Sequence, residues 1–271
     1  MNVLITGASG FIGTNLLKKL SINKRYKILT LSRKKIFYKA GKNIKNLKSD
    51  LDLSPSSISL IKIFSPQIII HLAWQDIPDY SKKNSQINFL KQKSFFEKIY
   101  KIKSIKKIIV TGSCSEHRNK HHLTSEFFVN SKLKIKKLIK KQNKNLVWLK
   151  LFFVFGKKQR KNSLIPFLIS SIKKNKLVKL KNPNMINDFI HVNDVSKFIL
   201  SHLNKIKENL EYDVGSGYGL KVLDIMNFYK KINKDKNNKI RKYTKCFKAN
   251  IPNNKLKIKI ETNKNLKLMM Y

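Results

Sequence analysis

Acidic residues are scarce in this chain of 271 residues: 15 Asp and Glu stand against 59 Lys and Arg, which gives a formal net charge of +44. Such an excess would suit nucleic-acid binding, because Lys and Arg neutralise phosphates and release counterions. Arginine is scarce as well, at five of the 59 basic residues, although base readout and planar phosphate recognition favour arginine. The lysines are spread over nearly every segment among many Asn and Ile. We therefore expect a compositional origin for the charge and no specific nucleic-acid partner.

Cysteine and long apolar runs are also lacking. Cys114 and Cys246 provide neither a disulfide framework nor the ligand spacing of a metal site, and two cysteines fit a reducing compartment. No apolar run of about 18 residues occurs, and Met1 leads directly into a strand-like segment, so we expect no membrane span, no signal peptide and a cytoplasmic protein. With 41% hydrophobic residues, the chain can still bury a substantial core in one large domain or one and a half.

Three of the nine glycines follow the first apolar run at intervals of three, as Gly7, Gly10 and Gly13. Residues 3–5 have the length of a buried strand, and the apolar residues of segment 11–20 have helical spacing. This order predicts a strand, a tight turn and a helix. Positive φ and close approach to a ligand are expected at Gly7 and Gly10, and close helix–strand packing at Gly13. The free N–H groups at the helix start would suit a pyrophosphate.

The spacing Thr-Gly-x-x-Gly-x-x-Gly resembles the cofactor loop of the extended short-chain dehydrogenase/reductases, the family of nucleotide-sugar epimerases, dehydratases and reductases. The resemblance implies an NAD(P) site in which Gly7, Gly10, Phe11, Ile12 and Gly13 bind the cofactor. A tight turn of this kind also arises for structural reasons alone. Its place directly after the first strand favours the cofactor loop.

The end of the second expected strand, residues 26–31, bears on the choice between NADP and NAD. In a dinucleotide fold an acidic residue there binds the ribose 2′-hydroxyl of NAD, and an arginine accommodates the 2′-phosphate of NADP. Here the strand leads into Ser32-Arg33-Lys34-Lys35, a segment that contains an arginine and no acidic residue. We therefore expect NADP to be preferred over NAD through Arg33, although a solvated basic loop would look the same in a lysine-rich chain.

Two further blocks resemble cofactor-binding positions of the family. Asp50 and Leu51 end the strand-like segment 44–51, at the family's adenine-contacting position. The continuous apolar run 66–74 is typical of a buried parallel strand and ends in His-Leu-Ala, where the resemblance implies that the backbone at Ala73 lies along the cofactor.

The fifth expected strand, residues 108–117, runs into a turn of small residues. Hydroxyl groups at the carboxyl end of a parallel strand are placed for chemistry in an α/β enzyme. By the family's pattern Ser113 holds the substrate oxygen, with Ser115 as the fallback. His117 stands where the family commonly has tyrosine.

The following helix carries the most informative departure from the family. Family members have Tyr-x-x-x-Lys, with one helical turn between the tyrosine and the lysine that lowers its pKa and binds the nicotinamide ribose. Lys132 matches that lysine, whereas Phe128 occupies the tyrosine position. A phenyl ring cannot carry a proton, so the proton donor stays unassigned.

The later chain resembles the family through the blocks 187–195 and 212–217, in which Asp194 is expected to cap the next helix. The resemblance implies an α/β fold with a doubly wound parallel sheet (a Rossmann fold) in residues 1–155, and a smaller, interleaved substrate lobe in 156–271. It also implies a nucleotide-sugar substrate and 4-keto reduction or epimerisation. The alternative is an NADP(H)-binding protein that has lost its acid. The sequence leaves open whether two copies of the chain form a homodimer.

Overall fold

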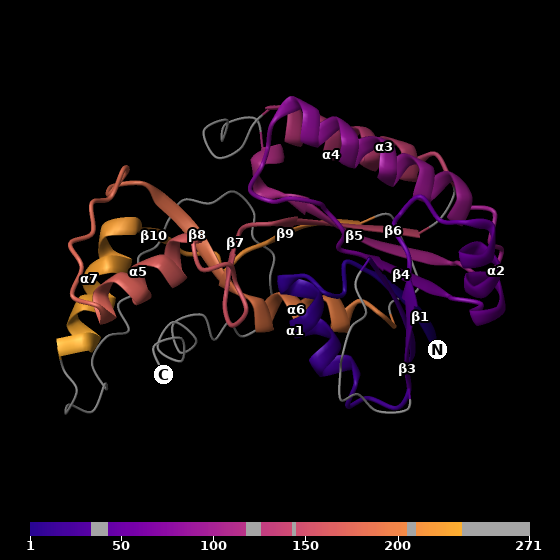
Figure 1. Cartoon of the computed structure of the whole chain (residues 1–271), viewed down its shortest axis with the longest axis horizontal. Coiled ribbons are helices and arrows are strands. Elements are labelled where there is room, and N and C mark those ends of the chain that lie inside the picture. Colours follow the sequence, from indigo (N-terminus) through magenta and orange to yellow (C-terminus); the bar gives the residue numbers. More distant parts are fainter. Residues whose placement is uncertain (34–42, 118–125, 143–144, 205–209, 235–271) are drawn as a thin grey trace. The chain divides into compact units, whose positions relative to one another are not determined.

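The computed structural model describes residues 1–33, 43–117, 126–142, 145–204 and 210–234 (Figure 1). Lys34, Lys35, Cys246 and the carboxyl-terminal end of the expected substrate lobe lie outside the described residues. The chain divides into two compact units, Met1–Leu151 with Ile199–Tyr212, and Phe152–Phe198 with Asp213–Tyr271. The chain thus leaves the first unit after Leu151 and returns to it once.

The first unit is built on a seven-stranded sheet with the order β3-β2-β1-β4-β5-β6-β9. Its strands are β1 (Asn2–Thr6), β2 (Lys27–Ser32), β3 (Ile44–Lys48), β4 (Ile68–His71), β5 (Lys107–Ser113), β6 (Asn145–Leu151) and β9 (Leu210–Val214). All pairings from β3 to β6 are parallel. Every residue of β4 is buried, as expected for a strand covered on both faces. The predicted doubly wound parallel sheet is confirmed.

Helices cover both faces of this sheet (Figure 1). They are α1 (Phe11–Leu20), α2 (Pro55–Phe64), α3 (Lys82–Ile99) and α4 (Glu126–Lys140). Apolar side chains of α2, α3 and α4 share one core with alternate residues of the strands, including Ile61, Phe95, Ile135, Ile108 and Trp148. α1 lies on the opposite face in Figure 1. The sequence sets the start of α2, because Ser54 caps it by accepting the N–H of Ser57 and Pro55 follows as the first helical residue.

The strand order reverses at β1, which pairs with β2 on one side and with β4 on the other. Connections from these strands therefore run in opposite directions. At such a reversal the loops after the carboxyl ends of the strands leave a crevice between them. The glycine-containing turn after β1 and the His-Leu-Ala segment that ends β4 both open into this crevice.

The second unit has a three-stranded sheet with the order β10-β8-β7. Its elements are β7 (Phe153–Phe155), α5 (Leu164–Lys173), β8 (Ile186–His191), β10 (Gly219–Lys221), α7 (Val222–Lys234) and most of α6 (Val192–Ser201), whose residues from Ile199 on belong to the first unit. β8 pairs parallel with β7 and antiparallel with β10. Apolar residues of α5 and α7 pack on this sheet as a separate core, with Leu168, Phe189 and Tyr229 at its centre.

The expectation that Asp194 caps α6 is wrong. The helix begins at Val192, so Asp194 lies inside its first turn, where its Oδ1 is 3.6 Å from Lys197 Nζ. β8 runs directly into the helix, which places His191 at the position before the first helical residue. The imidazole Nδ1 of His191 accepts the N–H of Asn193 at 3.2 Å and takes over the capping role.

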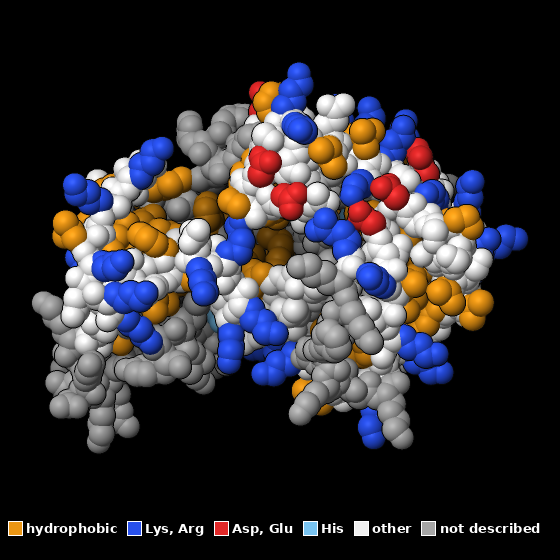
Figure 2. Space-filling model, in the orientation of Figure 1, with side chains coloured by type: hydrophobic (Ala, Val, Ile, Leu, Met, Phe, Trp, Pro, Cys, Tyr) orange, Lys and Arg blue, Asp and Glu red, His pale blue; other side chains and the backbone are white. Residues whose placement is uncertain are grey.

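The surface of the described residues carries lysines on almost every element. Figure 2 shows Lys and Arg side chains scattered over the visible face among polar and hydrophobic ones, and they form no continuous stripe on that face. In the described part of the chain, no helix has both the length and the apolar character that crossing a bilayer requires.

Candidate active site

The turn between β1 and α1 departs from expectation in one detail. Gly7 has φ 69°, and a Cβ there would lie 2.7 Å from the backbone N of Ala73, so glycine is required for conformation and for space. Gly10 instead has φ −76° and ψ 177°, an extended conformation open to any residue, so the expected positive φ at Gly10 is wrong. Gly10 precedes the first helical residue, and its N–H donates to the Gly7 carbonyl at 3.0 Å. One left-handed residue is enough to reverse the chain here.

Gly10 and Gly13 are glycines for reasons of space. A Cβ at Gly10 would meet only the Gly7 carbonyl oxygen at 3.2 Å, so the region beyond it is open. A Cβ at Gly13 would overlap that same carbonyl and lie 2.6 Å from Ala8 Cα, which shows that α1 packs tightly against its own turn. Open space thus lies over Gly10, where a dinucleotide backbone would approach.

The amino terminus of α1 is suited to an anion. Gly10 supplies no capping side chain, and the first turn, which holds Phe11, Ile12 and Gly13, contains no acidic residue. The first N–H groups of a helix have no intrahelical partner and carry the positive end of its dipole. These features fit a pyrophosphate group.

Most of the predicted cofactor-binding residues line one cleft of about 220 Å³ in the first unit. It is formed by loops at the carboxyl ends of β1, β2, β3 and β4, together with two residues of α3. Its predicted members are Gly7, Gly10, Arg33, Asp50, Leu51 and Ala73, and it is completed by Ser9, Leu31, Ser32, Ser49, Leu72, Trp74, Gln75, Asn88 and Lys91. Ser113 and Lys132 do not line it.

Asp50 and Lys91 form an ion pair on the wall of this cleft. Lys91 Nζ lies 2.6 Å from Asp50 Oδ2, and the N–H of Leu51 donates to Asp50 Oδ1 at 2.8 Å. Partial burial acts to raise the pKa of Asp50, but the hydrogen bonds from Lys91 and Leu51 and the charges of Lys91 and Arg33 hold it below its usual value. Asp50 is therefore an anion between two cations, with Arg33 exposed at the end of β2.

Ser113 ends β5 and caps the short 3₁₀-helix η1 (Cys114–Glu116). Its Oγ accepts the N–H of Ser115 at 3.2 Å, and its own N–H donates to Glu116 Oε1 at 2.8 Å. Ser113 is half-buried, whereas the fallback Ser115 is buried. The hydrogen bonds of the turn therefore set the position of Ser113, at the carboxyl end of a central strand. His117, half-buried, follows directly, and its N–H donates to the Cys114 carbonyl.

Lys132 projects from α4 and is 4% exposed. Its Nζ donates to the Thr111 carbonyl at 2.8 Å and lies 4.4 Å from the centroid of the Trp74 ring. Burial lowers the pKa of Lys132 to about 8, against the opposing effect of the Glu116 charge. Because Trp74 lines the cleft, it connects the lysine to the predicted cofactor-binding residues.

Phe128 belongs to a cluster of aromatic rings. Its ring meets those of Trp74 and Tyr80 edge-on, at centroid distances of 4.8 and 4.9 Å, and it is 6% exposed. Lys132 Nζ lies 5.9 Å from the Phe128 centroid. The side chain one turn before the lysine is therefore well packed and without a hydroxyl.

Trp74, Lys91 and Glu116 are site residues that were not expected from the sequence. A signal was available for two of them: Trp74 directly follows the His-Leu-Ala block, and Glu116 is one of only 15 acidic residues and stands in the turn after β5. Lys91 gave none, because a lysine on a helix is unremarkable in a chain with 59 basic residues.

Comparison with known proteins gives a consistent result. The sequence model of the NAD dependent epimerase/dehydratase family matches residues 3–215. A GDP-6-deoxy-D-talose 4-dehydrogenase of Aggregatibacter actinomycetemcomitans is 26% identical over 245 residues, which cover 83% of this chain and 78% of that protein.

Two solved structures share the fold. UDP-glucose 4-epimerase of Thermotoga maritima, solved with UDP-glucose, superimposes with a TM-score of 0.74 at 17% identity, covering 88% of this chain and 84% of that one. UDP-glucuronic acid 4-epimerase of Bacillus cereus, a tyrosine-to-phenylalanine mutant solved with UDP-4-deoxy-4-fluoro-glucuronic acid and NAD, gives a TM-score of 0.73 at 21% identity, covering 86% and 83%. Since the family match extends over most of the 271 residues, the chain belongs to the NAD-dependent epimerase/dehydratase family.

Proposed function

We propose that the protein is an NAD(P)-dependent enzyme that reduces a 4-keto group, or epimerises a hydroxyl-bearing carbon, on a nucleotide-linked sugar. The observation that carries the proposal is the glycine turn opening into the cleft between β1 and β4, with open space over Gly10. Membership of the family supports it, as do relatives whose names specify 4-dehydrogenation and 4-epimerisation of nucleotide sugars.

In this proposal each candidate residue has a defined task. A bound nicotinamide cofactor would supply hydride transfer to or from a sugar carbon. The turn from Gly7 and the first turn of α1 bind the pyrophosphate, and Asp50 with Leu51 lies beside the adenine. Lys132 holds the nicotinamide ribose as an ammonium donor, and the Ser113 hydroxyl orients the reacting oxygen of the sugar.

A second candidate function rests on Phe128. Because no proton can be carried at this position, the protein could instead bind NADP(H) with little or no turnover, in a sensing or structural role. Loss of a general acid–base group lowers rates by about 10²–10⁴-fold. The Bacillus cereus epimerase with a tyrosine-to-phenylalanine change was solved with NAD and a UDP-linked sugar bound, so binding and loss of a tyrosine hydroxyl are compatible in this fold.

One experiment distinguishes the enzyme from the binding protein. The protein is mixed with NADPH or NADH and a panel of nucleotide-linked 4-ketosugars, and the absorbance of the reduced nicotinamide is followed. A 4-keto reductase predicts oxidation of the reduced nicotinamide with at least one sugar. An epimerase leaves the amount of reduced cofactor unchanged overall and predicts conversion of a nucleotide-linked sugar to its epimer, which chromatography measures. The binding protein predicts a calorimetric signal with the dinucleotide, no absorbance change and no epimer with any sugar.

Arg33→Ala is expected to weaken NADP binding by about tenfold to a hundredfold, the value of charge-assisted hydrogen bonds to a phosphate, while NAD affinity stays the same. Arg33 lines the cleft at the end of β2 and is exposed there. Calorimetric titration with both cofactors measures the effect. Arg25→Ala removes the same charge from an exposed site outside the cleft and serves as the control. Equal losses for both cofactors, or a parent that prefers NAD, contradict the NADP assignment.

We also propose that two copies form a homodimer through α3 and α4. These helices pack together and leave apolar side chains exposed, among them Leu90 at 53% and Phe127 at 48%. Leu90→Glu is expected to convert the dimer to a monomer in sedimentation experiments, because a carboxylate would be buried without a partner. Leu60→Glu, on α2 and 51% exposed, is the matched control and should sediment as the parent does. A monomeric parent contradicts the proposal.

A further inference from the structure

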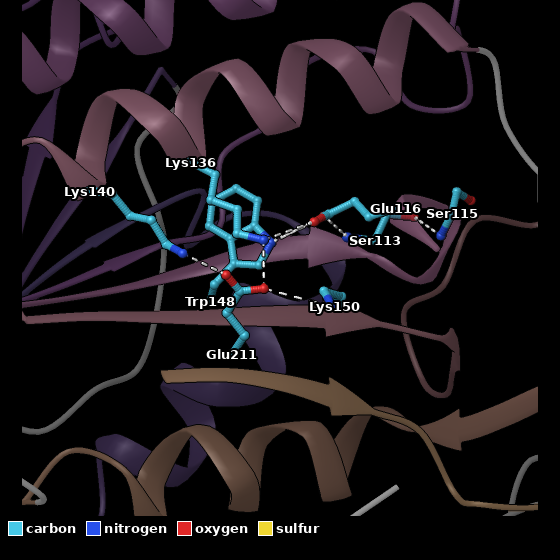
Figure 3. A network of polar contacts seen from close by, with 8 residues as sticks. All are labelled: Ser113, Ser115, Glu116, Lys136, Lys140, Trp148, Lys150 and Glu211. Atoms are coloured by element: carbon cyan, nitrogen blue, oxygen red, sulfur yellow. Dashed lines mark hydrogen bonds and ion pairs between the residues drawn. The ribbon is translucent and has the colours of Figure 1, made fainter. Parts of the chain in front are cut away.

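Glu116 belongs to a polar network in the first unit, where it contacts Ser113 and Trp148 (Figure 3). Its side chain is 2% exposed. Oε1 accepts the N–H of Ser113 at 2.8 Å, and the indole N–H of Trp148 lies 2.9 Å from Oε2 and 3.1 Å from Oε1. The carboxylate therefore connects the turn after β5 to the neighbouring strand β6.

The surrounding backbone leaves space for this carboxylate. A Cβ at Gly112 would overlap both Glu116 Oε1 and Trp148 Nε1, so a glycine in β5 is needed for the pair to form. Burial raises the pKa of Glu116, and the hydrogen bonds from Ser113 and Trp148 oppose that effect, as do the charges of Lys136 and Lys132. A buried carboxylate is costly unless its charge and hydrogen bonds are matched.

Two lysines of α4, one helical turn apart, are near this carboxylate, and their partners differ. Lys136 Nζ lies 3.9 Å from Glu116 Oε2 but only 2.6 Å from Glu211 Oε2 on β9. Glu211 also pairs with Lys140 at 2.9 Å and lies 3.7 Å from Lys150. Lys136 thus keeps a carboxylate partner if Glu116 is neutralised.

Among the described residues, no carboxylate forms an ion pair with Lys132. Its Nζ donates to the Thr111 carbonyl of β5, and it faces the Trp74 ring from the loop after β4 and the Phe128 ring from its own helix. His71 on β4 is neutral, because burial and the charge of Lys132 lower its pKa to about 3. Lys136 lies one turn farther along the same helix. Glu116 is the carboxylate whose charge favours the ammonium form of Lys132.

We propose that Glu116 is the positioning residue of the site: it fixes Ser113 through the backbone N–H, joins that turn to Trp148, and supplies a buried negative charge that acts on Lys132. The inference rests on the proposed function for the tasks of Ser113 and Lys132. Glu116 itself touches neither cofactor nor sugar in this role.

The sign of the effect follows from the two opposing influences on Lys132. Burial lowers the pKa of Lys132 and the Glu116 charge raises it, and burial prevails, so that the pKa is about 8. Removing that charge lowers the pKa further, so the ammonium is lost at a lower pH than in the parent. Dinucleotide affinity and turnover, which need the ammonium, then fall on the alkaline side at a pH where the parent is still active.

Glu116→Gln tests the charge and keeps the shape. The amide oxygen can still accept the Ser113 N–H. The titration of Lys132 is measured by competitive acylation with acetic anhydride across neutral to alkaline pH, read by mass spectrometry, and NADPH affinity is measured over the same range. We expect the Lys132 midpoint and the alkaline limb of NADPH affinity to shift together toward acid. Glu211→Gln removes a carboxylate from the same network and is expected to leave both midpoints unchanged, because Glu211 pairs with other lysines.

Glu116→Asp separates the two parts of the proposal. Aspartate keeps the charge but is shorter by one methylene, so the Lys132 midpoint should stay near that of the parent while turnover falls by up to about a hundredfold, as a small displacement of Ser113 would cause. An unchanged Lys132 midpoint in Glu116→Gln overturns the proposal, as does an equal shift in Glu211→Gln. A shifted midpoint in a protein that binds no NADPH contradicts the proposed function instead and leaves the link between Glu116 and Lys132 intact.

Discussion

Gly10→Val is expected to abolish NAD(P)H binding without unfolding the protein. Valine readily takes the extended conformation that Gly10 adopts, and its Cβ would meet only the Gly7 carbonyl at 3.2 Å. The added methyl groups would then fill the open space where the pyrophosphate must approach the α1 amino terminus. Loss of several charge-assisted hydrogen bonds corresponds to at least about a hundredfold weaker binding. Calorimetric titration measures the affinity, and thermal unfolding reports the fold.

Gly13→Val is the contrasting variant, three residues farther along. Its Cβ would overlap the Gly7 carbonyl and crowd Ala8, so the turn and the helix would have to separate. Overpacking of this kind costs about 1–3 kcal/mol, and we expect a lower melting temperature as well as lost binding. If Gly10→Val bound the dinucleotide as tightly as the parent, the cleft between β1 and β4 would not be the cofactor site.

The glycine turn shows what a sequence pattern can predict and what it cannot. The change from a run of apolar residues to helical spacing predicted strand, turn and helix, and the structure confirms β1 and α1 on either side of the turn. Spacing alone does not tell a glycine needed for positive φ, such as Gly7, from one needed for open space, such as Gly10. Both needs select the same residue, so only the dihedral angles separate them.

The cleft was predictable where it depends on topology. Carboxyl ends of neighbouring parallel strands meet at one edge of a sheet, so Arg33, Asp50 and Ala73 could be placed together from strand order alone. The contacts that tune the site were not predictable, because they join distant segments: Lys91 reaches Asp50 across 41 residues, and Trp148 reaches Glu116 across 32. Such pairs follow from how α3 and β6 are packed, which no local pattern encodes.

Phe128→Tyr has the largest effect on turnover if the missing acid is what limits the protein. The ring is held edge-on between Trp74 and Tyr80, so the new hydroxyl adds one oxygen to a side chain already seated. Burying a hydroxyl without a partner costs about 1–3 kcal/mol. Two donors lie close to this ring: the ammonium of Lys132, 5.9 Å from its centroid, and the indole N–H of Trp74, which is buried without a hydrogen-bond partner in the described part of the chain.

Lys132 would also lower the pKa of the new hydroxyl, since a nearby ammonium stabilises a phenolate. We therefore expect Phe128→Tyr to raise turnover of a suitable nucleotide-linked 4-ketosugar by about 10²–10⁴-fold, with NADP affinity unchanged. Stopped-flow or steady-state absorbance of NADPH measures the rate. Phe127→Tyr adds the same oxygen to the neighbouring residue, which is 48% exposed, and should leave the rate unchanged.

His117→Ala distinguishes a lost acid from a replaced one. His117 follows η1 directly after Glu116, at the position where the family commonly has tyrosine, and it is only half-buried. If an imidazole there already delivers the proton, the parent is active, Phe128→Tyr gains little, and His117→Ala lowers turnover by about 10²-fold or more. A different outcome is an inactive parent that still binds the dinucleotide, with no activity gained in Phe128→Tyr and no change in His117→Ala. In that case the protein does not act as an enzyme on these sugars. Such a result would favour a protein that binds NADP(H) without turnover.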